Sequence, residues 1–357
     1  MKALRIIRNQ DGIALLVALT VITVLVALTL ALHQKLDSAL EASVADRHRV
    51  SMTQMANSGI QLAMAMLVKD KLESQVDSVQ EDWANPDKIA EAMSAIVFDT
   101  GSVSVVISDE RSRIQVNALV ALPGHDFNPI QFQVWNRLFG VLIKQYEPLK
   151  DLDYMVLINS LKDWIDSGDD DAITGLSGAE SSYYMDLDPA YECRNAPLNH
   201  LGDLARIKGF PPELFVAGDN FPQISDILTV QGMVPAAKGG YTFDGKINID
   251  TAGVMVLSAI LPEEYAIHAQ DIVDYRVETV GDQYANNLSS DTWYKNVPGL
   301  EDLNLDPELI TTKSDLFRIT ATATLDTDVL TIVAVVQRET IEKTGKWHCK
   351  ILYWETK

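Results

Sequence analysis

An uninterrupted apolar segment near the N-terminus dominates the hydrophobic pattern of this chain. Residues 13–32 carry no charge, and their polar members are Thr20, Thr23 and Thr29. A helix rises about 1.5 Å per residue, so this segment spans about 30 Å, the thickness of the hydrocarbon core of a bilayer. Threonine hydroxyls are tolerated there because they can donate to the helix backbone. The pattern predicts a transmembrane helix.

A short basic leader precedes this helix. Its bases Lys2, Arg5 and Arg8 outnumber Asp11, so we expect the leader in the cytoplasm and everything after His33 on the other side of the membrane. A secretory signal peptide would have a shorter apolar core followed by a small-residue cleavage site, whereas here the small residue precedes the core. Two interpretations remain: a leader that is cleaved off before the helix, or a plain membrane anchor whose leader is never cleaved.

A second hydrophobic pattern continues the helix to about residue 72. Its apolar residues recur at helical steps and define one stripe, formed by Leu36, Leu40, Val44, Met52, Met55, Leu62 and Met66. A helix over 13–72 would be about 90 Å long. We expect its outer half to bury this stripe against a sheet of the same chain.

Alternating apolar residues predict five short strands in two groups. The first group is a hairpin of 103–107 and 114–116, and the second comprises 317–323, 329–336 and 350–354. A long, mostly helical stretch separates the groups. We interpret this as an α+β fold whose sheet is interrupted by an insertion. Two unrelated sheets are the alternative, but each would be too small to be stable alone. The expected parts are a leader at 1–12, the helix at 13–72, the first α+β part at 73–121, an inserted α-helical domain at 122–314 and closing strands at 315–357.

The insertion contains a dense acidic segment directly after the amphipathic helix 157–165. Crowded carboxylates repel one another, and a hard cation such as Ca²⁺, which prefers oxygen ligands, relieves the repulsion. The spacing excludes an EF-hand, because Ile173 and Thr174 stand where an oxygen ligand and a glycine belong. A solvated acidic turn without metal is the alternative. The segment holds Asp163, Asp166, Asp169, Asp170, Asp171 and Glu180, interleaved with Gly168, Gly175 and Gly178.

Charge and cysteine content narrow the class of protein. The formal net charge is -21, and loss of the leader would leave about -23, so the surface repels nucleic-acid phosphates and anionic lipid headgroups. Cys193 and Cys349 are far apart in sequence. An oxidising compartment permits a disulfide between them but does not require one.

Motifs of enzymes and of nucleic-acid binding are missing. The sequence has no GxSxG, HExxH or phosphate-loop pattern, and its six histidines are scattered, so we predict a protein that is not an enzyme. Segments 193–210 and 245–261 are similar to helix-hairpin-helix units. Neither has the paired glycines of the DNA-binding hairpin, and bases are sparse around them. We therefore expect no nucleic-acid partner and no catalytic residue.

The basic leader, Gly12 and the long apolar helix resemble the N-terminus of type IV pilin-like proteins, whose leader is cut on the cytoplasmic face, here between Gly12 and Ile13. Most members carry Glu at the fifth position after the cut, where this sequence has Val17. Other segments extend the resemblance to the family of K-type minor pseudopilins of type II secretion systems. They are SRIQVNAL at 112–119, DWID at 163–166, GAE at 178–180 and CRNAPL at 193–198.

This resemblance implies a pseudopilin fold, in which a long N-terminal helix packs on a small antiparallel sheet, with a large helical domain inserted. It also implies a calcium-binding segment whose ligands would be Asp166, Asp169, Asp171 and Glu180, with Asp170 next. The helix-hairpin-helix-like units would be packing modules of the insertion.

The implied function is mechanical. The family's partners are the minor pseudopilins I and J at the tip of a periplasmic pseudopilus, the prepilin peptidase, the inner membrane, and the secretin and secreted substrates. A subunit without the membrane carboxylate cannot neutralise the N-terminal amine of a subunit stacked outside it, so the resemblance places this chain at the tip. A minor pilin of a type IV pilus or DNA-uptake system is the alternative, and a membrane-tethered periplasmic enzyme is a third.

Overall fold

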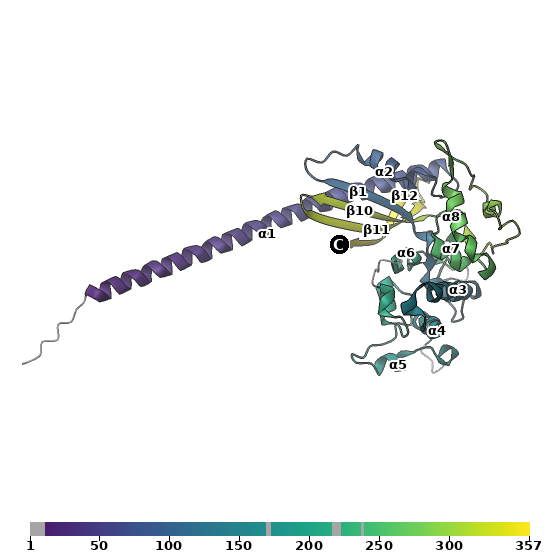
Figure 1. The fold of residues 1–357 in the computed structure, drawn as a ribbon, viewed down its shortest axis with the longest axis horizontal. Helices are drawn as coiled ribbons and strands as arrows, with labels where there is room; N and C mark the ends of the chain where they lie inside the picture. The colour runs from purple at the N-terminus through teal and green to yellow at the C-terminus, as the bar shows by residue number, and fades with distance from the viewer. Residues whose placement is uncertain (1–10, 169–172, 216–222, 237–238) are drawn as a thin grey trace, which may run out of the picture.

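A long helix and a globular body make up the molecule. The computed structural model describes residues 11–168, 173–215, 223–236 and 239–357. Helix α1 runs from Asp11 to Glu73, and its N-terminal half projects far from the body (Figure 1). By length and composition, one helix of the described residues, Gly12–Glu73, could cross a membrane. The helix predicted at 13–72 is confirmed.

Helix α1 changes its surroundings along its length. Leu36, Leu40 and Val44 are 54%, 65% and 52% exposed, because the helix has not yet reached the body at these positions. Among them only Val44 lies in the outer half of the helix, and its predicted burial is wrong, since helical spacing does not reveal where the sheet ends. The residues of α1 that are buried are Met52, Met55, Ala56, Ile60, Ala63 and Leu67.

Four antiparallel strands form the sheet that covers the C-terminal part of α1. Their spatial order is β1-β10-β11-β12, so the first strand pairs with a strand from the far end of the sequence. Alternate residues of the first three strands in this order face α1 and share one apolar core with it, to which the last strand adds Cys349. The strands predicted in the tail are confirmed. The strands are β1 (Ser102–Asp109), β10 (Leu316–Leu325), β11 (Asp328–Thr340) and β12 (Trp347–Thr356).

Gly59 permits the close approach of α1 to β1. A Cβ at this position would lie 2.8 Å from Val105 Cγ2 and 3.0 Å from Val103 Cγ1, closer than a side-chain carbon can come. Helix α2 (Pro86–Met93) covers the same flank of the sheet and is capped by Asn85, which accepts the N–H groups of Asp87 and Lys88. The sheet therefore has one flank that α2 protects.

The first predicted hairpin does not form. β1 pairs with β10 over its whole length, while Ile114–Gln115 forms β2, which lies parallel to β3 (Leu228–Thr229). A 3-10 turn at Glu110–Ser112 redirects the chain, and Arg113 fixes it by donating from Nη1 to the Asp109 carbonyl at 2.8 Å. The main sheet thus has four strands, and residues 114–116 belong to the core of the insertion.

The insertion, residues 112–311, is built from short elements around its own apolar core. In Figure 1 it lies beside and below the sheet, at the end opposite the projecting helix. Its helices are α3 (Pro129–Gln145), α4 (Tyr154–Ile165), α5 (Ser181–Met185), α6 (Ile224–Ile227), α7 (Val254–Ile260) and α8 (Ala269–Val277). Its further strands are β4 (Met233–Pro235), β5 (Tyr241–Phe243), β6 (Ile247–Asn248), β7 (Thr279–Val280), β8 (Gln283–Tyr284) and β9 (Ile310–Thr311).

The two segments similar to helix-hairpin-helix units differ from each other in structure. Residues Leu201–Arg206 form a 3-10 helix, whose period explains why the leucines from Leu198 onward recur at strict three-residue steps. The second segment contains α7, whose N-cap is Gly253.

The two cysteines do not form a disulfide. Cys193 lies in the core of the insertion and Cys349 in the core between α1 and the sheet. The bridge that the sequence left open is therefore excluded by their positions.

Candidate functional site

The predicted calcium loop leaves the C-terminal end of α4. This helix begins at the N-cap Asp153, whose carboxylate accepts the N–H groups of Met155 and Val156, and it places Asp163 and Asp166 at its end. Glu180 lies on the returning chain, just before α5. The candidates Asp169, Asp170 and Asp171 lie outside the described residues.

Asp163 organises this loop from inside. Its carboxylate is fully buried and accepts the N–H groups of Thr174, at 3.2 and 3.3 Å, and of Ala179, at 2.9 Å. A Cβ on Gly178 would lie 1.9 Å from Asp163 Oδ2, so this position requires glycine. The DWID and GAE segments therefore meet through a hydrogen-bonded turn. Sequence analysis counted Asp163 among the acids of the segment and did not predict this role.

Asp166 combines burial with an unsatisfied oxygen. The residue is 4% exposed; Oδ2 accepts the Lys162 ammonium at 2.6 Å, while Oδ1 is buried and has no hydrogen-bond partner among the described residues. Burial raises the pKa of Asp166, and the Lys162 ammonium, together with the backbone N–H of Gly168, opposes that shift. An orphaned carboxylate oxygen next to three further acids in the sequence fits a cation ligand.

Glu180 completes the described part of the loop. It is buried, and the adjacent Tyr184 packs edge-on against Trp164 with ring centroids 5.0 Å apart. Lys208 donates to the carbonyl oxygens of Ser177, at 3.2 Å, and Gly178, at 3.1 Å. Two ammonium groups, those of Lys162 and Lys208, therefore already offset part of the negative charge near the loop.

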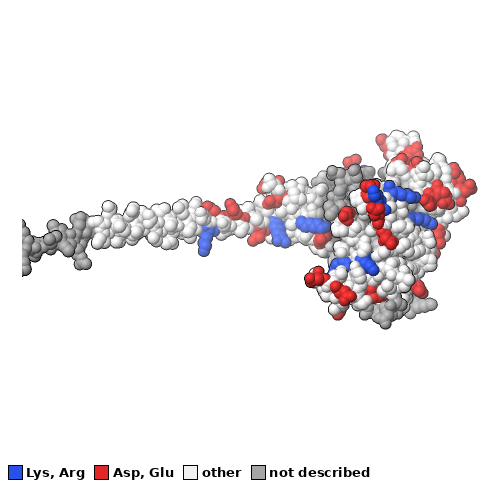
Figure 2. All heavy atoms as spheres, turned by 60° about the horizontal axis from the view of Figure 1, so that its bottom comes forward, with Lys and Arg blue, Asp and Glu red and all other residues white. Residues whose placement is uncertain are grey.

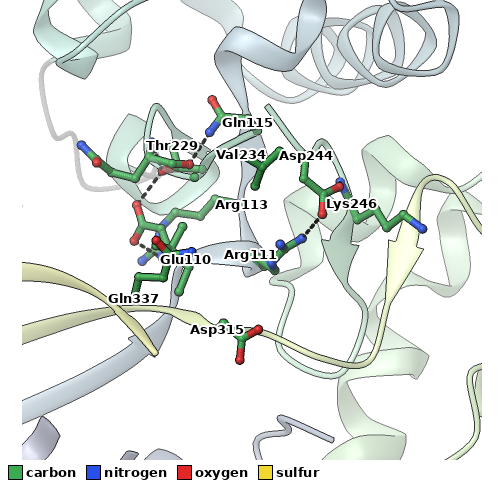
Figure 3. Close-up of a pocket in the computed structure, with 13 residues that line it drawn as sticks. Glu110, Arg111, Arg113, Gln115, Thr229, Val234, Asp244, Lys246, Asp315 and Gln337 are labelled. Atoms are coloured by element: carbon green, nitrogen blue, oxygen red, sulfur yellow. Dashed lines mark hydrogen bonds and ion pairs between the residues drawn. The ribbon is translucent and has the colours of Figure 1, made fainter. Parts of the chain in front are cut away.

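A buried ion cluster joins the insertion to the sheet. Glu110 is 0% exposed and accepts Arg318 Nη2 from β10 at 2.7 Å, Arg113 Nη1 at 3.3 Å and the Thr229 hydroxyl of β3 at 2.6 Å. Beside it lies a cavity of about 200 Å³, where Arg111 pairs with Asp244 at 2.6 Å (Figure 3). The lining charges all have partners: Lys246 pairs with Glu308 at 3.6 Å and Asp315 with Lys71 at 3.0 Å. We therefore interpret this region as a structural joint between sheet and insertion.

A second buried cluster lies where α1 ends. Arg338 of β11 is fully buried, donates to Asp70 at 2.9 Å and also pairs with Asp77. Glu81 is near, and one ligand oxygen from each of these three acids lies within 4.8 Å of the others. Burial and the neighbouring Glu81 and Asp77 raise the pKa of Asp70 to about 7, because one guanidinium cannot offset three carboxylates. Sequence analysis missed this cluster, since its members are far apart in the chain.

The N-terminal helix carries the predicted processing site. Gly12 is exposed, and a Cβ there would meet nothing within 4 Å, so packing within this chain does not require glycine. Threonine hydroxyls of the apolar half donate to carbonyl oxygens one turn earlier, at 2.8 Å for Thr20, Thr23 and Thr29. Figure 2 shows this half of α1 without charged side chains, whereas acidic residues gather on the body.

Comparisons with known proteins agree with these features. Residues 112–221 match the family model described as "Type II secretion system (T2SS), protein K". Three relatives bear the name Type II secretion system protein K. That of Aeromonas hydrophila is 26% identical over 58% of this chain, that of Pseudomonas aeruginosa 26% identical over 75%, and that of Klebsiella pneumoniae 27% identical over 58%. These matches span 61%, 73% and 60% of the relatives' own lengths.

The fold has a solved counterpart. A chain in the crystal structure of the GspK–GspI–GspJ complex from the type II secretion system of enterotoxigenic Escherichia coli superposes with a TM-score of 0.60. The match covers 88% of this chain and 99% of the other, at 16% sequence identity. The domain match and the three relatives make this chain similar to protein K of type II secretion systems over the matched residues, and the solved chain shares its fold.

Proposed function

We propose that this chain is a minor pseudopilin that leads the periplasmic pseudopilus of a type II secretion system. One observation carries the proposal: the N-terminal half of α1 is exposed and apolar, and it has Val17 where pilin-like subunits carry a carboxylate. Residues 13–32 would lie in the inner membrane, with the leader in the cytoplasm and the body in the periplasm.

The position at the tip follows from electrostatics and bulk. A carboxylate inside a membrane costs a few kcal/mol and is kept where it has a partner. A chain without it cannot receive the N-terminal amine of a subunit stacked outside it, and the insertion adds bulk on that side. The solved complex with the related fold contains GspK, GspI and GspJ, so we infer I- and J-type subunits as neighbours. The role is structural: to begin or cap assembly for export through the secretin.

The test of this function is the state of the N-terminus. Protein purified from membranes should begin at Ile13, and a Gly12→Leu variant should keep its leader, as intact-mass measurement would detect. Gly140 is a matched control, because a Cβ there also meets nothing within 4 Å, so Gly140→Ala should be processed normally. Survival of Met1 in the wild type would exclude the prepilin interpretation.

We propose further that the loop between α4 and α5 binds Ca²⁺ for structural reasons. Asp166 and Glu180 would be ligands, with Asp169, Asp170 and Asp171 supplying further oxygens. The orphaned Oδ1 of Asp166 supports this assignment. Asp163 is not assigned as a ligand, because its carboxylate is occupied by backbone N–H groups. The ion would offset the loop's negative charge and hold its two ends together.

Calcium-dependent thermal unfolding tests this site. Wild-type protein should be stabilised by about 2.7 kcal/mol when Ca²⁺ is at 100 times its Kd, and Asp166→Asn/Glu180→Gln should lose the effect. The matched control is Asp186→Asn/Asp188→Asn, which removes the same charge from two exposed residues nearby. If Asp166→Asn/Glu180→Gln kept the full calcium response, the metal assignment would be wrong.

A further inference from the structure

One side of the sheet has a free edge. β12 is the last strand in the order β1-β10-β11-β12, and in the described part of the chain its strand partner is β11 alone. Natural proteins protect such edges, because unpaired backbone groups invite another strand. The opposite flank is protected by α2, whose Ile89 and Met93 are 4% and 8% exposed.

The register shows which backbone groups of β12 point outward. Thr331 and Lys357 exchange both hydrogen bonds, at 3.0 and 2.8 Å, so in the alternating pattern Thr356 and Trp354 direct their N–H and C=O groups away from β11. Beyond the irregularity at Val335/Val336, the Arg338 N–H donates to the carbonyl oxygen of Asp315, which directly precedes β10. The backbone of Arg338 therefore points toward β10 and away from β12. Its partner Cys349, and likewise Ile351, therefore also point outward.

The same residues present an apolar surface. Ile351 and Trp354 pair with Val336 and Ala334, which face α1, so their side chains lie on the α1 side of the sheet. They are nevertheless 42% and 40% exposed, although α1 contacts the start of this strand, where Cys349 Sγ donates to the Met64 carbonyl at 3.7 Å. Outward backbone groups and uncovered apolar side chains thus coincide on β12.

Charge indicates what kind of segment fits. Exposed Lys343, Lys346 and Lys350 lie along the β11–β12 turn and the start of β12, and in the described part of the chain no carboxylate lies within 4.0 Å of them. The turn itself contributes a single acid, Glu342. This local excess of positive charge stands out in a chain of net charge -21.

We propose that the edge of β12 docks an extended strand from a neighbouring subunit, with carboxylates facing the three lysines and apolar residues covering Ile351 and Trp354. The identity of that neighbour as an I- or J-type pseudopilin rests on the proposed function. A second copy of this chain is a poorer fit, because a two-fold antiparallel pair would set the lysine-bearing start of one β12 against the end of the other, where Glu355 already pairs with Lys357 at 3.1 Å. Strand addition supplies main-chain hydrogen bonds, and the side chains select the partner.

Hydrogen exchange of the full-length protein in detergent, alone and mixed with the I- and J-type subunits of the same system, tests the proposal. We expect the backbone N–H groups of Cys349, Ile351 and Trp354 to become protected only in the mixture. A complex that forms without this protection would overturn the strand-addition proposal and leave the proposed function intact. Absence of any complex would count against both. Protection of the chain alone, with dimers in solution, would make a second copy the occupant and also overturn the proposal.

Two variants sharpen the test. Trp354→Lys and Lys346→Glu/Lys350→Glu should each weaken the complex about tenfold or more, the second chiefly at low salt. The control is Val106→Lys, an exposed apolar residue (61%) on the other edge strand, which should leave the affinity unchanged. Because the altered lysines are exposed, a loss of binding by the charge variant cannot be ascribed to misfolding. Equal weakening by the control variant would contradict the assignment to β12.

Discussion

The sheet unit, formed by α1, α2 and the four-stranded sheet, and the insertion are stabilised in different ways. The sheet unit has a periodic interior, in which one helix and alternating strand residues share an apolar core. The insertion has short helices and turns, and buried polar side chains bond its backbone. Asn117, for example, donates to the Leu198 carbonyl at 3.1 Å and accepts the Leu198 N–H at 2.7 Å. Periodic apolar residues stabilise the sheet unit, whereas individual hydrogen bonds from polar side chains stabilise the insertion.

The largest expected effect concerns Arg338, a buried charged residue in the otherwise apolar interior of the sheet unit. Replacing it by leucine leaves Asp70 and Asp77 buried without their cation, and we expect a loss of about 3–5 kcal/mol in the free energy of unfolding. Urea denaturation of the detergent-solubilised full chain measures this loss. Lys350→Leu, on the adjacent strand but exposed, should change the free energy by about 0.5 kcal/mol or less. Similar losses for both would mean that the cluster contributes little.

The next effect tests whether single contacts hold the insertion together. Gly178→Ala forces a methyl group against the Asp163 carboxylate, which we expect to cost about 1–3 kcal/mol. Gly202→Ala is the matched control within the insertion, because a Cβ there would meet nothing within 4 Å. The same unfolding measurement applies. If both variants were equally stable, the turn around Asp163 would not be a determinant of this unit.

A different kind of effect, a pH dependence, is expected at the contact between the two units, where the Asp250 carbonyl accepts the Val79 N–H at 3.4 Å. Burial raises the pKa of Asp250 to about 8, against the hydrogen bond from Trp293 Nε1 and the charge of Arg276. The folded state therefore holds a proton that the unfolded state releases. This contribution to stability is complete below about pH 4 and is lost as the pH rises through about 8.

Asp250→Asn should accordingly flatten the fall in melting temperature between pH 5 and pH 8. The exposed Glu263 is the control, since Glu263→Gln should leave the slope over this range as it is in the wild type. A slope that Asp250→Asn does not alter would mean that this carboxyl is ionised in the folded state throughout the range.

Sequence analysis predicted the elements that have a regular spacing of apolar residues. The long helix and the strands of the tail follow from apolar periodicity, and the structure confirms them. The hairpin at 103–116 was wrong because alternation does not name a strand's partner. Glu110 turns the chain toward the insertion there, through contacts with Arg318 and Thr229 that lie far away in sequence.

The candidate site was predicted only in outline. Acid density located the loop, but density could not separate Asp163, which bonds backbone N–H groups, from Asp166, which retains an unpartnered oxygen in the described part of the chain. A signal was nevertheless present, because the glycine Gly178, followed by the small residue Ala179, indicated that another group comes close to the backbone there. That group is the Asp163 carboxylate. The Asp70, Asp77 and Arg338 cluster had no local signal, because tertiary packing alone assembles it.

Under the proposed membrane topology, the pairing of β1 with β10 constrains the order in which the chain matures. The insertion is continuous in sequence and has its own core, so it can fold as soon as it has crossed the membrane. The sheet, in contrast, cannot close until the last forty or so residues have been translocated, because they supply three of its four strands. Until then α1 would, under that topology, already lie in the bilayer while its apolar residues at 52–67 lacked most of their cover. A chain truncated near its C-terminus would thus retain its membrane anchor and a folded insertion but could not complete the surface at β12.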